Sequence, residues 1–145
     1  MEKLHLYLVR HCESLGNREN IFQGQLDLDI SATGEKQLAL LALRFRNIPI
    51  DAVYSSPLKR AYKTAEAVDL YHSLPIIKLP ELMEVDVGAL SGMKLDKAFA
   101  DYPVFAEKWQ NSPQNCIFPE GETTAEVYGR AKKALARVKA DCMGK

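Results

Sequence analysis

Residues 4–11 are Leu4, His5, Leu6, Tyr7, Leu8, Val9, Arg10 and His11, and this stretch decides the fold. Leu4 to Val9 is a short, nearly continuous apolar run, which predicts a buried strand of the kind that parallel sheets use. Residues 11–30 are polar, contain glycine and show no helical period, so they predict a long loop. The strand would therefore end at Arg10 and His11, where the loop begins.

The next segments alternate between helix and strand. Residues 52–55 and 75–79 predict two further short strands. Ser31 can cap a helix that Asn47 and Pro49 end, and Ser56 and Pro57 are a serine cap and a proline at the first helical position of another. The expected buried positions of the two helices are Leu38, Leu41, Ala42 and Phe45, then Leu58, Ala61, Ala65 and Val68.

The order strand, loop, helix, strand, helix, strand predicts parallel strands with right-handed crossovers. Residues 80–93 predict another loop, and 94–101 and 104–110 predict two short helices. Thr123 or Thr124 caps a last helix, with its apolar face at Val127, Ala131, Ala134, Leu135 and Val138. We therefore expect one α/β domain over residues 1–145, with three α/β/α layers and a mainly parallel sheet.

Composition narrows the class of protein. The 145 residues predict one domain, and 47% hydrophobic and 26% charged residues are ordinary for a globular protein. Lys plus Arg and Asp plus Glu each number 19, so neither a nucleic-acid surface nor an anionic-membrane surface is expected. No apolar run approaches the roughly 18 residues that a membrane helix needs.

The cysteines and the N-terminus predict the compartment. Met1 to Leu4 lack the apolar region and cleavage site of a signal peptide. Cys12, Cys116 and Cys142 are odd in number and have no metal-site spacing, and the three histidines are too scattered for a zinc site. We expect a cytoplasmic protein with reduced thiols and no bound metal.

The residues that follow each predicted strand carry the chemistry, because open parallel sheets place their sites beyond the carboxyl ends of the strands. Arg10 and His11 follow the first strand, Arg60 follows the second, and Glu81 and Glu84 follow the third. Arginine forks match phosphate oxygens, histidine attacks phosphorus, and a carboxylic acid protonates a leaving oxygen. The combination predicts phosphoryl transfer without a metal.

Several segments, in order, resemble the motifs of the histidine phosphatase superfamily, the phosphoglycerate-mutase-like group. The first is similar to the Arg-His-Gly signature of that family, and the resemblance covers essentially the whole chain. The matching segments are Leu8 to Ser14 with Asn17, residues 28–34 with Gln37, residues 55–61 with Thr64 and Ala65, Glu84 with Gly88 and Gly92, and Gly121 to Thr123 with Arg130.

The resemblance implies a phosphatase of phosphate monoesters with a phosphoglycerate mutase-like fold, a small phosphorylated substrate and no cofactor. It implies that His11 is the nucleophile that becomes phosphohistidine and that Glu84 is the general acid. It also implies that Arg10 and Arg60 clamp the phosphoryl group while Asn17 helps to bind it. The expected substrate-binding set is completed by Ser14, Gln23 and Gly24.

The chain departs from the family pattern in two places. Cys12 stands where the family has a glycine after the nucleophile, and no histidine follows His72. No strand is expected after the last helix, whereas the family has one there, between the strands equivalent to residues 4–9 and 52–55. The chain thus looks shortened before that strand, and turnover should be low. We expect that the two strands pair directly, that the chain folds poorly, or that another chain supplies an edge; self-association is favoured.

Other interpretations of the site stay open. Cys12 and Arg18 have the Cys-x5-Arg spacing of cysteine-dependent tyrosine phosphatases, although no Asp-Pro acid occurs in the chain. A phosphoglycerate mutase-type transfer is less favoured because the stretch between Glu84 and Gly121 holds only about two helices. A non-catalytic phosphate-binding relative is the third alternative.

Single residues also have competing interpretations. Glu81 and Asp86 compete with Glu84 for the role of general acid. Ser14 either binds phosphate or makes hydrogen bonds within its loop. Arg130 is expected to anchor its helix rather than to touch substrate.

Overall fold

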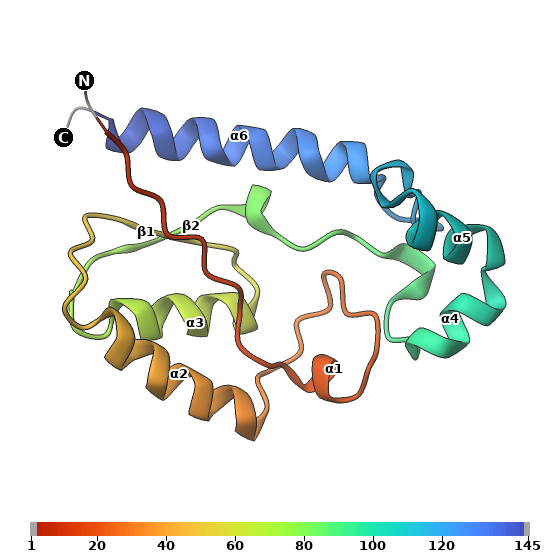
Figure 1. The fold of residues 1–145 in the computed structure, drawn as a ribbon, viewed down its shortest axis with the longest axis horizontal. Coiled ribbons are helices and arrows are strands. Elements are labelled where there is room, and N and C mark those ends of the chain that lie inside the picture. Colours follow the sequence, from red (N-terminus) through yellow and green to blue (C-terminus); the bar gives the residue numbers. More distant parts are fainter. Residues whose placement is uncertain (1–2, 144–145) are drawn as a thin grey trace.

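The computed structural model describes residues 3–143, so Met1 and Glu2 of the N-terminal stretch without a signal peptide lie outside the described residues. Helix α6 lies on one side of two short strands, and α2 and α3 lie on the other, which is the expected three-layer order (Figure 1). The helices are α1 (Leu15–Arg18), α2 (Ala32–Phe45), α3 (Lys59–Asp69), α4 (Leu95–Asp101), α5 (Pro103–Asn111) and α6 (Thr124–Cys142). The strands are β1 (Val53–Ser55) and β2 (Ile76–Lys78), and the 3-10 turns are η1 (Pro80–Leu82), η2 (Gly88–Leu90) and η3 (Pro113–Asn115).

The sheet of the described residues consists of β1 and β2, which pair in parallel with Val53 opposite Ile76. Both strands lie inside the predicted ranges, and the parallel pairing across the α3 crossover is confirmed. The carboxyl ends of both strands therefore lie at the same edge of the sheet, followed by residues 56–60 and η1.

The predicted first strand at Leu4 to Val9 is wrong for the described residues. Residues 3–13 form no strand, and β1 has its ladder with β2 only. Leu8 is 92% exposed, and the Tyr7 ring packs edge-on against Phe45 of α2 at 5.8 Å. A strand exists only where a neighbour completes its hydrogen bonds, and within residues 3–143 the first segment and β1 have not closed up into a pair.

The second helix starts later than predicted. Ser56 and Pro57 lie before α3, and Ser56 Oγ accepts the N–H of Leu58 at 3.3 Å in a turn. Asp27 of the long loop accepts the Lys59 N–H at 2.7 Å and so caps the helix from outside. The serine cap was a wrong prediction because a distant carboxylate satisfies the first helical N–H.

The predicted caps of α2 and α6 are present, whereas the predicted buried faces of these helices are buried only in part. Ser31 caps α2 by accepting the Gly34 N–H at 3.0 Å, and Thr123 caps α6 in a capping box with Glu126. Ala42 and Phe45 of α2 are buried, and α2 packs against α3. In α6 only Ala134 of the predicted face is buried, whereas Leu135 is 52% exposed, because α6 packs mainly on η1 and η3.

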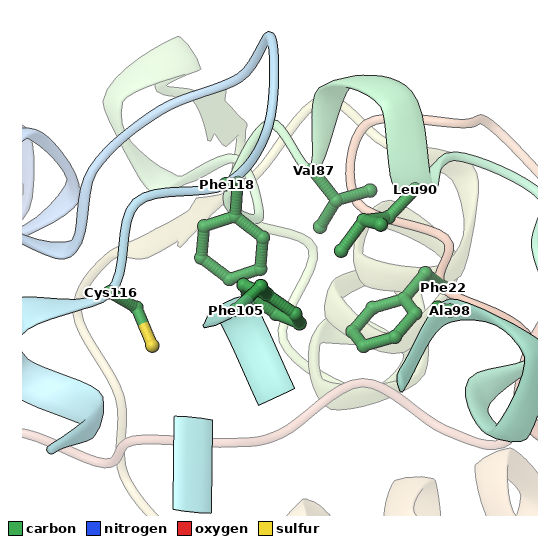
Figure 2. Packing of buried hydrophobic residues seen from close by; sticks show 7 residues of the cluster. All are labelled: Phe22, Val87, Leu90, Ala98, Phe105, Cys116 and Phe118. Atoms are coloured by element: carbon green, nitrogen blue, oxygen red, sulfur yellow. The ribbon is translucent and has the colours of Figure 1, made fainter. Parts of the chain in front are cut away.

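A second centre of packing lies away from the sheet, around α4, α5 and η2 (Figure 2). The Phe105 ring stands 5.0 Å from Phe118 and 5.9 Å from Phe22, centroid to centroid. The buried residues of this cluster are Phe22, Val87, Leu90, Ala98, Phe105, Cys116 and Phe118. This cluster fixes the loop after β2 against residues 116–118, and that loop carries Glu84.

Gly34 gives a stability prediction with an internal control. A Cβ at Gly34 would lie 2.2 Å from the carbonyl oxygen of Glu13, so Gly34→Ala forces α2 away from the His11 loop. We expect this overpacking to lower the free energy of unfolding by about 1–3 kcal/mol. At Gly129 of α6, nothing lies within 4 Å of the added carbon, and Gly129→Ala should raise stability by about 0.5–1 kcal/mol. Urea unfolding measures both; equal effects of the two variants would contradict the tight contact at Gly34.

Candidate active site

The proposed catalytic groups come from three separate segments. His11 follows the extended N-terminal segment, Arg60 lies in the first turn of α3, and Glu84 lies between η1 and η2. His11 is close enough for the charges of Arg10, Arg60 and Glu84 to act on its pKa. The structure thus brings the four residues to the sheet edge at which the carboxyl ends of β1 and β2 lie.

The His11 ring is held by its own loop. Its Nδ1 lies 2.6 Å from the carbonyl oxygen of Cys12. A carbonyl only accepts hydrogen bonds, so Nδ1 carries the proton and Nε2 keeps its lone pair in the neutral ring. Burial lowers the pKa of His11, and the Arg60 and Arg10 charges lower it further against the opposing effects of the Cys12 bond and Glu84. The neutral form of the imidazole is therefore favoured over the protonated form.

Arg60 is a buried cation, 2% exposed, and its guanidinium is oriented by the loop that contains residues 24 and 26. Its Nη2 donates to the carbonyl oxygen of Gly24 at 2.6 Å and its Nη1 to that of Leu26 at 2.9 Å. Burial lowers the pKa of Arg60, and the charges of Glu84 and Asp27 oppose that shift. Two of its five donor hydrogens are used in this way, which leaves donors for phosphate oxygens.

Arg10 is exposed and lines a cavity beside the nucleophile. The cavity has a volume of about 240 Å³ and is lined by Arg10, His11, Cys12, Gln37, Leu38, Leu41 and Thr64. It adjoins His11 from the α2 side, and neither Arg60 nor Glu84 lines it. Two of the four candidate residues, Arg10 and His11, therefore line this cavity.

The loop after His11 is held by Ser14, which is fully buried. Ser14 Oγ donates to Gln23 Oε1 at 2.6 Å and lies 2.9 Å from Asn17 Oδ1, and it caps α1. These contacts favour the interpretation of Ser14 as a loop residue over direct phosphate binding. The oxygens of Asn17 and Gln23 are occupied by Ser14, so their amide nitrogens remain the groups that could donate to a phosphate.

The backbone conformation and close packing at position 24 require a glycine. Its φ is +50°, and an added Cβ would lie 2.7 Å from the carbonyl oxygen of Val85. Its own carbonyl oxygen is the acceptor for Arg60. Gly24 therefore positions the Arg60 guanidinium and lets the long loop approach the segment that carries Glu84.

Glu84 is the exposed carboxylate of its segment, and its Oε1 accepts the Val85 N–H at 2.9 Å. Its charge acts on the pKa of both His11 and Arg60. The Asp86 carboxylate instead accepts the Gly88 N–H at 2.9 Å and closes a turn. The charge of Glu84 therefore acts on His11, whereas the Asp86 carboxylate serves a turn.

The contacts and the pKa of the Cys12 thiol disfavour a role as nucleophile. A Cβ at Gly34 would lie 3.3 Å from its Sγ, so the sulfur packs against α2. Burial raises the pKa of the Cys12 thiol, which disfavours the thiolate that attack requires. Its N–H donates to Thr64 Oγ1 at 3.0 Å, and that hydroxyl donates to the Arg60 carbonyl at 2.7 Å. Thr64 thus connects the His11 loop to α3.

Two further properties of the described residues concern metals and membranes. Among residues 3–143, no three His, Cys, Asp or Glu side chains are grouped so that they could hold a metal ion. None of the helices in the same range combines the length and apolar character required to cross a bilayer.

Comparison with known proteins identifies the family of this chain. The model of the histidine phosphatase superfamily (branch 1) matches residues 6–145. Phosphoserine phosphatase 1 of Hydrogenobacter thermophilus is 40% identical over 134 residues, which are 92% of this chain and 64% of that protein. This chain therefore spans less than two thirds of the length of that relative.

Solved structures show the same fold. Bacillus stearothermophilus YhfR superposes with a TM-score of 0.87 at 27% identity, over 93% of this chain and 67% of that one. The alpha-ribazole phosphatase of Shigella flexneri superposes with a TM-score of 0.82 at 26% identity, over 91% and 65%. With its fold and its motifs matched in this way, the chain belongs to the histidine phosphatase superfamily, branch 1.

Proposed function

We propose that this protein hydrolyses phosphate monoesters through a phosphohistidine at His11. The observation that carries the proposal is the Nδ1 contact of His11 with the Cys12 carbonyl at 2.6 Å, which leaves Nε2 as the nucleophilic atom. The ring lies within electrostatic range of two arginines and one carboxylate. A neutral imidazole near two cations that match phosphate oxygens supports nucleophilic phosphoryl transfer.

In the first step, Nε2 of His11 attacks phosphorus and forms the N–P bond as the P–O bond to the alcohol breaks. The electron pair of that bond stays on the leaving oxygen, which takes a proton from the Glu84 carboxylic acid. Arg10 and Arg60 stabilise the charge on the equatorial oxygens throughout. The products are the free alcohol, phosphohistidine and the Glu84 carboxylate.

In the second step, water attacks phosphorus and the N–P bond breaks, which returns its electron pair to Nε2. The Glu84 carboxylate accepts a proton from the water, so the carboxylic acid is restored. Inorganic phosphate leaves, and His11 is again neutral with its proton on Nδ1. The same carboxyl group therefore serves first as acid and then as base.

The substrate class that we propose is a small phosphorylated alcohol. The relatives named above include a phosphoserine phosphatase and an alpha-ribazole phosphatase, both of which act on phosphate monoesters by name. We also propose a cytoplasmic location, supported by the three cysteines, which are all free thiols.

Assay of the 145-residue protein against a panel of phosphomonoesters tests the function. We expect slow release of phosphate from small alkyl phosphates such as phosphoserine, and burst formation of a phosphoenzyme. Binding of phosphate by calorimetry without turnover of any ester would instead identify a non-catalytic phosphate-binding relative.

The unpaired side of the sheet supports a further part of the proposal, self-association. Within residues 3–143 β1 pairs with β2 alone, and the nearby N-terminal segment exposes Leu6, Leu8 and Val9. Open strand edges and exposed apolar side chains favour pairing with another copy. Light scattering should show dimers or larger species that Leu8→Lys shifts toward monomer; a wild-type monomer at high concentration would contradict this.

A further inference from the structure

Arg130 of α6 has all five of its donor hydrogens engaged, and none of its partners belongs to its own helix. Nε and Nη2 donate to the two carboxylate oxygens of Glu122, at 2.9 and 2.8 Å. Nη1 donates to the carbonyl oxygens of Glu81, at 3.0 Å, and of Met83. Nη2 also donates to the carbonyl oxygen of Glu84 at 2.9 Å.

Glu122, the carboxylate partner of Arg130, holds the same segment on the C-terminal side of Glu84, at Asp86. Glu122 Oε2 accepts the Asp86 N–H at 2.8 Å, and the Glu122 N–H donates to the Asp86 carbonyl oxygen at 2.9 Å. The Arg130 and Glu122 side chains are only 18% and 22% exposed, so water screens the pair weakly. The ion pair therefore fixes the backbone before and after Glu84.

We infer that Arg130 is a positioning residue for the general acid: with Glu122 it fixes the backbone of residues 81–86 so that the Glu84 carboxyl reaches the leaving oxygen of the ester. This inference rests on the proposed function. Because the Glu84 side chain accepts the N–H of the next residue, Val85, its direction follows that backbone. Arg130 does not touch the substrate, since its donors are already used.

If Arg130 only anchored α6, its hydrogen bonds would be needed to hold that helix in place. Helix α6 has other anchors: Tyr54 of β1 donates to Asp141 at 3.2 Å, and Thr124 donates to the Pro113 carbonyl oxygen at 2.8 Å. Three of the five Arg130 hydrogen bonds go instead to carbonyls of the segment that ends at Glu84. The contact that would be lost with Arg130 is therefore that of the acid segment, while the ends of α6 keep theirs.

Two substrates with different leaving groups distinguish a positioning role of Arg130 from a general loss of structure. An alkyl phosphate needs a proton on its leaving oxygen, whereas p-nitrophenolate leaves without one. We expect Arg130→Gln to lower kcat for an alkyl phosphate by roughly 10²-fold, the effect of misplacing a catalytic group by about 1 Å. Turnover of p-nitrophenyl phosphate should fall less than about 3-fold, and Glu122→Gln should show a weaker form of the same split, with one acceptor oxygen kept.

Arg137→Gln is the matched control, because Arg137 also lies on α6 and donates to a carboxylate, Asp141, at 2.7 Å, but at an exposed position. It should leave the rates for both esters unchanged. Equal losses for the two esters in Arg130→Gln and Glu122→Gln would assign Arg130 to structure alone and overturn the inference. An unchanged rate for the alkyl phosphate would also overturn it.

Hydrogen exchange gives a readout that does not need activity. The Asp86 amide, which donates to Glu122, should exchange at least about 10-fold faster in Arg130→Gln than in wild type, while amides in α2 keep their protection. Wild-type protein that turns over neither ester would refute the proposed function but leave this measurement standing. Unchanged exchange at residues 84–86 would overturn the positioning role even if the enzyme is active.

Discussion

His11→Ala is expected to abolish the phosphoenzyme and to lower phosphomonoester turnover by roughly 10⁴-fold or more, the scale on which removal of a nucleophile acts. The Nε2 atom supplies the bond that holds phosphorus between the two steps. The His72 ring is engaged elsewhere, with its Nε2 2.9 Å from the carbonyl oxygen of Phe45. Trapping with a ³²P-labelled monoester measures the intermediate directly. Phosphohistidine is stable in alkali and labile in acid.

Cys12→Ser is the control for this prediction. Serine replaces the buried thiol with a group of similar size while Nδ1 of His11 keeps its carbonyl acceptor. Labelling should therefore persist in Cys12→Ser. If label were lost in Cys12→Ser and kept in His11→Ala, the attack would come from sulfur and the histidine mechanism would be wrong.

The pKa of His11 determines how activity depends on pH in the acidic range. Burial and two arginine charges lower that pKa from the ordinary value of 6.5, so the neutral, nucleophilic ring persists to lower pH than in a free imidazole. We expect kcat/KM to fall with acidification at a midpoint below 6.5. His11 contributes least to stability in acid, because its protonated form is favoured in the unfolded chain.

Local sequence patterns predicted the helices well and the first strand badly, for a physical reason. The cap at Ser31 and the apolar spacing of residues 38–45 act within one segment, and α2 forms where they indicate. A strand depends on a neighbour: the apolar run from Leu4 to Val9 has strand character, but the described chain gives it no ladder. Its side chains are accordingly exposed rather than buried.

The residue types that follow the strands predicted which side chains lie near one another, but not the contacts that hold them. His11, Arg60 and Glu84 come together because the ends of β1 and β2 and of the extended segment lie at one edge. The partners of Arg60 are the backbone carbonyl oxygens of residues 24 and 26. Every residue has a backbone carbonyl oxygen, whatever its side chain. No pattern of residue types could identify them.

The same limit applies to Arg130 and to Asp27. The sequence predicts only that Arg130 anchors its helix, because its spacing on α6 does not show that it contacts the carbonyl oxygens of residues 81–84. Asp27 caps α3 across 32 positions of sequence, which displaced the expected Ser56 cap. Motifs therefore predict the candidate reacting groups, whereas the groups that position them depend on tertiary structure.

Glu84→Gln is the second variant with a large expected effect. An amide cannot give a proton to the leaving oxygen, and loss of a general acid typically costs 10²–10⁴-fold. We expect kcat for an alkyl phosphate to fall by roughly 10³-fold, with a much smaller fall for p-nitrophenyl phosphate, whose leaving group needs no proton. Steady-state kinetics with both esters measures the difference.

Two neighbouring carboxylates serve as controls for Glu84. Glu81 takes part in the acid segment through its carbonyl oxygen, which accepts from Arg130, so Glu81→Gln should leave both rates within about 3-fold of wild type. Asp86→Asn removes a carboxylate that closes the turn to Gly88, and it should lower stability and both rates together. A selective loss on the alkyl ester in either control, with Glu84→Gln unaffected, would move the proton donor to that residue. The Asp86 carboxylate is occupied in the turn to Gly88, whereas the charge of Glu84 acts on the pKa of both His11 and Arg60.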